Sequence, residues 1–123
     1  MINNNRISLG EKGEKAVGSF LEKKGFKILD FNFSVRDGEI DIIAERENTI
    51  AFVEVKTRKI NYFHTSNVIT KSKQKKIIKA AKKWLLLFPH IDKVHRFDVA
   101  LVTENSDELL INYIPNAFNE GSF

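Results

Sequence analysis

Hydrophobic and polar residues alternate most strictly in two neighbouring segments, 39–44 and 52–56. A period of two is typical of β-strands, so these segments predict a hairpin. If residues 47–48 form the centre of a two-residue turn, antiparallel pairing places Asp41 directly opposite Glu54. A turn of three or four residues would shift this register.

Two further segments repeat their hydrophobic residues every three or four positions, which predicts amphipathic helices. The first is expected over residues 9–24, because residues 8–11 match a capping box and Gly25 is a helix stop signal. The second is expected over residues 71–88, and it stops at Pro89.

Three more strands are expected, at residues 26–33, 96–103 and 109–114. The order of elements is then α-β-β-β-α-β-β. A helix between the third and fourth strands can form a crossover to a parallel neighbour, whereas the hairpins give antiparallel pairs. We therefore predict an α/β fold with a mixed β-sheet of about five strands flanked by helices, in a single domain spanning residues 1–123.

Composition narrows the class of protein. The chain has 123 residues, of which 42% are hydrophobic, enough for one modest core. It contains no cysteine, which excludes disulfides, thiolate metal sites and thiol nucleophiles and agrees with a reducing compartment. Because the sequence shows neither a signal peptide nor an apolar segment long enough to cross a bilayer, we expect a cytoplasmic protein without membrane contact.

The predicted hairpin carries acids where a strand would normally present a core face. Asp41 and Glu54 would face each other, and like charges in that position destabilise a sheet by roughly 0.2 to 1 kcal/mol. Lys56 can neutralise only one of the two anions, so a divalent cation would complete the site. Carboxylates without cysteine or paired histidine ligands favour Mg²⁺ or Mn²⁺ over zinc. An ordinary surface salt-bridge network of the same three residues is the alternative interpretation.

Positive charge is concentrated in the second predicted helix. The net charge is +4, and residues 71–83 contain seven lysines and no acid. A lysine-rich helix face is often only solvated surface. Beside a carboxylate cluster, such a face also suits a phosphate backbone, because lysines attract phosphate without regard to base sequence. The candidate nucleic-acid-binding residues are Arg58, Lys59, Lys71, Lys73, Lys75, Lys76 and Lys79.

The charged hairpin also carries a family resemblance. The strings Gly38-Glu39-Ile40-Asp41-Ile42-Ile43-Ala44 and Phe52-Val53-Glu54-Val55-Lys56-Thr57-Arg58 resemble the signature of the YraN-type bacterial family of predicted endonucleases. That family is similar to archaeal Holliday-junction resolvases and belongs to the restriction-endonuclease-like superfamily. The resemblance extends from residues 10–16 through the lysine-rich helix to residues 96–99. One departure is Ile40, which stands where the superfamily's Pro-Asp element has proline.

The resemblance implies a restriction-endonuclease-like fold and a set of catalytic residues. The superfamily core carries over to Glu14, Asp41, Glu54 and Lys56, and Gln74 occupies a position where many members keep a glutamine near the site. Asp41 and Glu54 would hold Mg²⁺ or Mn²⁺ together with the main-chain carbonyl of Val55. The implied reaction is metal-assisted hydrolysis of a phosphodiester, in which Lys56 orients or deprotonates the attacking water.

The implied substrate is nucleic acid, DNA in preference to RNA, with a branched or single-stranded structure. The similarity to resolvases also favours a homodimer. Tyr62, Phe63 and His64 would either stack on unpaired bases or simply anchor a loop beside the site. Asp98 is expected to support the site by a hydrogen bond or by an ion pair with Arg58, without a catalytic role. A non-catalytic nucleic-acid-binding module with the same fold and a protein-interaction factor are the alternative functions.

Overall fold

The computed structural model describes residues 7–59 and 69–120, and its elements follow the predicted order. They are α1 (Leu9–Lys23), β1 (Lys27–Val35), β2 (Gly38–Arg46), β3 (Thr49–Lys59), α2 (Lys71–Leu87), β4 (Val94–Asn105) and β5 (Glu108–Phe118). The prediction α-β-β-β-α-β-β is confirmed. β4 and β5 are longer than predicted, because residues at their ends also pair across the sheet: Val94 lies opposite Thr49, Asn105 opposite Glu108 and Phe118 opposite Phe97.

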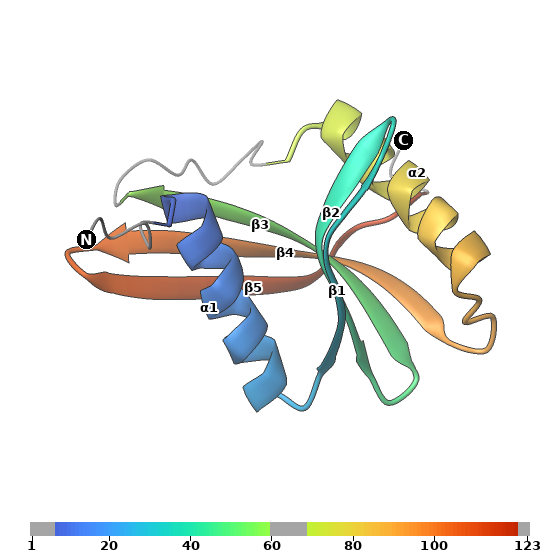
Figure 1. Cartoon of the computed structure of the whole chain (residues 1–123), viewed down its shortest axis with the longest axis horizontal. Helices are drawn as coiled ribbons and strands as arrows, with labels where there is room; N and C mark the ends of the chain where they lie inside the picture. Colours follow the sequence, from blue (N-terminus) through green and yellow to red (C-terminus); the bar gives the residue numbers. More distant parts are fainter. Residues whose placement is uncertain (1–6, 60–68, 121–123) are drawn as a thin grey trace, which may run out of the picture.

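The five strands form one mixed sheet in the order β1-β2-β3-β4-β5. β3 and β4 are parallel, and the other neighbouring pairs are antiparallel. α2 connects the two parallel strands, as the sequence order predicts. Figure 1 shows the strong twist of this sheet, with α2 beside the β1–β2 hairpin and α1 across the strands.

The sheet separates two buried clusters, one beneath each helix, because alternate residues of β2 and β3 point to opposite faces. The cluster on the α2 face contains Ile40, Ile43, Ile50, Phe52, Ile77, Ile78, Ala80, Ala81, Trp84, Val99 and Phe118. The cluster on the α1 face contains Val17, Leu21, Phe26, Ile42, Ala44, Ala51, Val53, Ala100 and Val102. The fold is therefore a sheet covered by a helix on each face.

Local capping residues set the helix bounds. At the start of α1, Glu11 N donates to Ser8 Oγ at 3.1 Å and Ser8 N donates to Glu11 Oε1 at 3.4 Å, which is the predicted capping box. Beyond its end, Gly25 has a φ of +93°, a conformation that favours glycine. Neither helix in the described part of the chain is long and apolar enough to cross a membrane.

The β2–β3 hairpin has the predicted register, with Arg46 opposite Thr49 and Ile42 opposite Val53. Glu47 takes the left-handed turn conformation, with φ of +52°. Beyond Ile42 and Val53 the two strands separate: β2 continues along β1, and β3 continues along β4. The point of separation is therefore at Asp41 and Glu54, the two acids that the register places opposite each other.

Two glycines let the helices approach the sheet closely around this point. A Cβ at Gly13 of α1 would lie 1.9 Å from Thr57 Oγ1 on β3. A Cβ at Gly38, the first residue of β2, would lie 2.4 Å from the carbonyl oxygen of Lys76 in α2. Only a residue without a side chain fits at either position. Both helices are thus held close to the place where β2 and β3 separate.

Candidate metal and nucleic-acid site

Asp41 occupies the fork between the two strands. Its Oδ2 accepts a hydrogen bond from Val55 N at 2.8 Å, so the side chain replaces the backbone acceptor that a continued ladder would have supplied. The N–H and C=O of a strand residue point toward the same neighbouring strand. The Val55 carbonyl therefore faces the same side as the Asp41 carboxylate, as a carbonyl ligand at this site requires.

Glu54 is buried beside Asp41 and is short of partners. The residue is 4% exposed, and its Oε1 has no hydrogen-bond partner among residues 7–59 and 69–120. Its Oε2 lies 3.7 Å from Lys73 Nζ. Burial raises the pKa of Glu54 to about 8, the negative charge of Asp41 raises it further, and the charges of Lys73 and Lys56 oppose the shift. When both acids are ionised their charges repel each other, and the loose contact with Lys73 compensates that repulsion only in part.

Glu14 approaches the pair from α1. Burial raises the pKa of Glu14, the negative charge of Asp41 raises it further, and a hydrogen bond with Asn32 opposes the shift. The preceding residue, Gly13, packs closely on Thr57 of β3, which holds this turn of α1 near the strand. Within the two described ranges, no three histidine, aspartate or glutamate side chains are arranged to hold a metal ion together. The site is therefore a pair of carboxylates with a third acid close enough for the Asp41 charge to raise its pKa.

Lys56, Gln74 and Lys73, which the sequence also assigns to the site or its surroundings, make different contacts in the structure. Lys56 is half-buried two residues after Glu54, and its charge lowers the pKa of that acid. Gln74 Nε2 donates to the carbonyl of Ile69 at 3.0 Å, so this amide holds the beginning of α2. Lys73, expected only as a nucleic-acid contact, is the α2 lysine that approaches Glu54.

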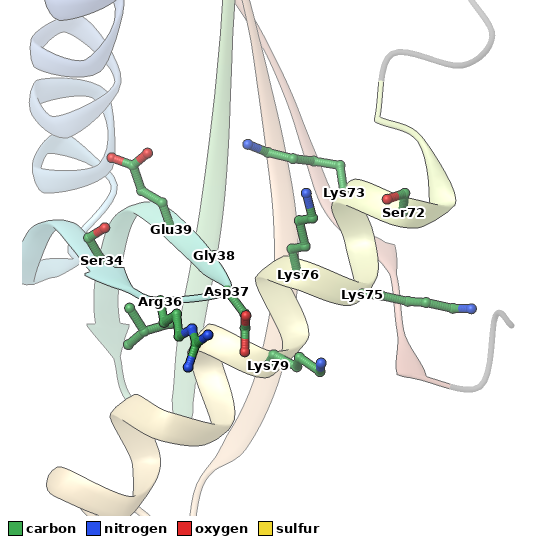
Figure 2. Close-up of a pocket in the computed structure, with 11 residues that line it drawn as sticks. Ser34, Arg36, Asp37, Gly38, Glu39, Ser72, Lys73, Lys75, Lys76 and Lys79 are labelled. Atoms are coloured by element: carbon green, nitrogen blue, oxygen red, sulfur yellow. The ribbon is translucent and has the colours of Figure 1, made fainter.

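A basic groove begins at Lys73, the lysine that approaches Glu54, and runs between α2 and the turn from β1 to β2. Its first part has a volume of about 640 Å³ and is lined by Ser34, Val35, Arg36, Asp37, Gly38, Glu39, Ser72, Lys73, Lys75, Lys76 and Lys79 (Figure 2). Its second part has a volume of about 680 Å³ and adds Lys82, Lys83 and Leu86. We call these two parts together the basic groove. In Figure 2, the Lys73 side chain points from α2 toward the side on which Glu39 of β2 lies, whereas Lys75 points the opposite way.

The predicted nucleic-acid contacts fall into two groups. Four of them line the basic groove: Lys73, Lys75, Lys76 and Lys79. The remaining three lie outside it, and Arg58 Nη1 donates to the carbonyl of Thr57 at 2.9 Å. Arg36 also lines the groove, but it was not among the contacts predicted from the sequence. Its position in the turn before the charged hairpin could have indicated it. Tyr62, Phe63 and His64 lie outside the described residues.

Asp98 belongs to a separate buried network. It is 0% exposed, and it accepts hydrogen bonds from Arg96 Nε at 2.9 Å, Arg96 Nη2 at 3.0 Å and Asn116 N at 2.8 Å. Tyr113 OH also donates to it, and burial, followed by the Asp98 charge, raises the pKa of that phenol. The predicted ion pair with Arg58 is wrong. Arg96 lies two residues away on the same face of β4, where it reaches Asp98 directly.

These features define a class of small α/β protein in which a forked hairpin presents two acids beside a basic helix. Residues 13–102 match the uncharacterised protein family UPF0102. The chain is 45% identical over 112 residues to a UPF0102 protein of Geobacter metallireducens, covering 90% of this chain and 92% of that protein. It is 41% identical over 119 residues to a UPF0102 protein of Chloroherpeton thalassium, covering 95% and 87%. The chain belongs to family UPF0102, which confirms the YraN-type resemblance.

Proposed function

We propose that this protein is a Mg²⁺- or Mn²⁺-dependent endonuclease that hydrolyses phosphodiester bonds in DNA, on a restriction-endonuclease-like fold. One observation carries the proposal: a buried carboxylate oxygen of Glu54 has no partner in the described structure, beside a second carboxylate and at the end of a basic groove. A buried polar atom without a partner costs about 1 to 3 kcal/mol, and more when it is charged. A ligand that supplies positive charge would remove that cost.

The donor set fits a hard divalent cation. Asp41 and Glu54 supply carboxylate oxygens, and the Val55 carbonyl faces the same side of the fork. Mg²⁺ usually keeps several water ligands and takes only one or two protein carboxylates, so a third acid is not required. Glu14 would then bind a water of the ion instead of the ion itself. This accounts for its position near Asp41 without a three-acid cluster.

The residues around the ion have separate roles in the proposed reaction. Bound Mg²⁺ supplies a Lewis acid that stabilises phosphoryl charge and lowers the pKa of a coordinated water. Lys56 orients or deprotonates the attacking water from its place two residues after Glu54. The lysines of the basic groove hold the strand on either side of the cleaved phosphate. Gln74, whose Nε2 donates to Ile69, would position the attacking water or the strand through its amide oxygen.

The groove supports binding of a phosphate backbone without sequence preference, and the resemblance to junction resolvases supports branched or single-stranded DNA as the substrate class. The groove is lined by side chains of one helix and one turn, with lysine as the main cation, and lysine contacts to phosphate carry no sequence preference. The resemblance to junction resolvases supports a homodimer, since a junction presents two equivalent strands.

Cleavage assays with Asp41→Asn test the proposal. The amide oxygen of asparagine still accepts a hydrogen bond from Val55 N, so the fork stays folded while the carboxylate charge is lost. We expect Mg²⁺-dependent cleavage of branched and single-stranded DNA by the unmodified protein, and a loss of at least about 100-fold in the variant. Circular dichroism checks folding. Lys79→Gln is the matched control, because this lysine lines the groove away from the acids and its loss should weaken binding instead of the chemistry. Metal-independent cleavage, or full activity of Asp41→Asn, would contradict the proposal.

A non-catalytic nucleic-acid-binding module is the second candidate. It is favoured by the basic groove, which exists whether or not the acids hold a metal ion, and by the presence of two converging acids instead of three. DNA binding that weakens steeply with salt, without strand scission in Mg²⁺ or Mn²⁺, would support this function.

A further inference from the structure

Lys73 lies where the acid pair meets the basic groove. Its ammonium is 3.7 Å from Glu54 Oε2, while its side chain is 41% exposed and lines the groove. Ammonium-to-carboxylate hydrogen bonds are typically about 2.7 to 2.9 Å long, so this contact is loose. One ammonium cannot fully neutralise both a buried carboxylate and a phosphate in the groove. Lys73 therefore stands between two competing partners.

The base of this side chain is fixed even though its end is exposed. Lys73 N donates to Thr70 Oγ1 at 3.1 Å, which places the residue in the first, capped turn of α2. The close contact between Gly38 and the Lys76 carbonyl holds that part of the helix against β2. The ammonium can thus change partners through rotations of its own side chain, without movement of the helix.

We propose, on the basis of the proposed function, that Lys73 couples divalent-cation binding to nucleic-acid binding. Without nucleic acid, its ammonium stays near Glu54 and competes with the cation for that carboxylate. When a phosphate backbone occupies the basic groove, the ammonium contacts phosphate and leaves Glu54 to the cation. By linkage, each ligand then increases the affinity for the other by the same factor.

The coupling can be measured by binding, without cleavage. Calorimetry gives the affinity for Mn²⁺ alone, and fluorescence anisotropy gives the affinity for a cleavage-resistant phosphorothioate single strand with and without Mn²⁺, at constant ionic strength. Three full-length proteins are compared: the unmodified protein, Lys73→Gln and Lys79→Gln. Lys79 lines the same groove on the same helix, so its variant shows what the loss of any groove lysine does.

We expect Lys73→Gln to bind Mn²⁺ alone roughly three- to tenfold more tightly than Lys79→Gln, because the competing ammonium is gone. Mn²⁺ should increase the oligonucleotide affinity of the unmodified protein and of Lys79→Gln by a larger factor than it increases that of Lys73→Gln. Lys73→Arg, which keeps the charge, should keep the coupling.

The outcomes separate this inference from the proposed function. If Lys73→Gln and Lys79→Gln bind Mn²⁺ equally and show equal coupling, the role of Lys73 is wrong while the metal site stands. If none of the proteins binds Mn²⁺, the metal site and the coupling are both wrong. If Lys73→Gln does not fold, loss of coupling in the folded Lys73→Arg would overturn the charge mechanism.

Discussion

Asp98 and Glu54 are both buried acids, and they lie on neighbouring strands at adjacent positions of the β3–β4 pairing. Asp98 shares the α1 face with its neighbour Val53, whereas Glu54 shares the α2 face with Phe52. Asp98 receives hydrogen bonds from Arg96, from Tyr113 and from the backbone of Asn116. Glu54 has a second carboxylate beside it, a loosely placed lysine and an oxygen without a partner in the described residues.

This difference shows that burial alone does not mark a functional acid. A fold that needs a buried carboxylate for stability surrounds it with donors, as β4 and β5 do for Asp98. Glu54 has comparable burial and little compensation, and this is the basis of the proposed cation. The comparison predicts that mutations which neutralise the two acids have opposite effects on stability.

The largest expected effect is the loss of stability in Asp98→Asn. The variant leaves the Arg96 guanidinium without its counter-charge and puts an amide where donors converge, so unfolding should become easier by about 2 to 4 kcal/mol. Urea unfolding at pH 7 measures this change. A loss below about 0.5 kcal/mol would mean that the network contributes little, and the contrast with Glu54 would fail.

Features governed by neighbouring residues were predictable from the sequence. The two-residue turn fixed the register of Asp41 and Glu54, because a hairpin constrains its own pairing. The capping box at Ser8 and the glycine after the first helix gave the bounds of α1 within one residue. These predictions depended on interactions within a few positions of the chain.

Partners brought together by packing were not predictable in the same way. Asp98 obtains Tyr113 and Asn116 from β5, at positions fixed by strand pairing and not by any local motif. The approach of Lys73 to Glu54 depends on how closely α2 packs on β2, which Gly38 permits. The fork at Asp41 could not be predicted either. The alternation of hydrophobic and polar residues does not show where β2 and β3 stop pairing with each other.

The second effect is a gain of stability in Glu54→Gln at alkaline pH. The pKa of Glu54 is about 8 in the folded protein and near its ordinary value of 4.5 when unfolded. The unfolded state therefore ionises first, and the metal-free protein loses stability as the pH rises from about 4.5 to about 8. Glutamine stays neutral, so the variant should be more stable by about 2 to 3 kcal/mol at pH 8 and should lack this pH dependence.

Urea unfolding between pH 5 and pH 8.5, in the presence of a chelator, checks this prediction. The two proteins should have similar stability at the acidic end and diverge as the pH rises. If the stability of both proteins changed with pH in the same way, the buried charge of Glu54 would be compensated to the same extent as that of Asp98. The argument for a bound cation would then fail. Mn²⁺ should narrow the difference by stabilising only the protein with the carboxylate.

The smallest effect concerns Thr57, whose hydroxyl is the other buried oxygen on β3 without a partner in the described structure. Gly13→Ala would place a methyl group 1.9 Å from that hydroxyl and push α1, with Glu14, away from the fork. We expect a loss of about 1 to 2 kcal/mol. Gly10→Ala is the matched control, because its nearest neighbour is Ser8 Oγ at 3.8 Å, and better helix propensity should add up to about 1 kcal/mol.

Thermal unfolding measures the difference in stability between the two variants. Cleavage assays at a temperature where both are folded then show whether the position of α1 also affects activity. If Glu14 acts through a water of the metal ion, Gly13→Ala should lower Mg²⁺-dependent cleavage while Gly10→Ala leaves it unchanged. Equal cleavage by the two variants would show that the position of α1 affects stability alone. Glu14 would then be a partly buried acid near the site with no part in its chemistry.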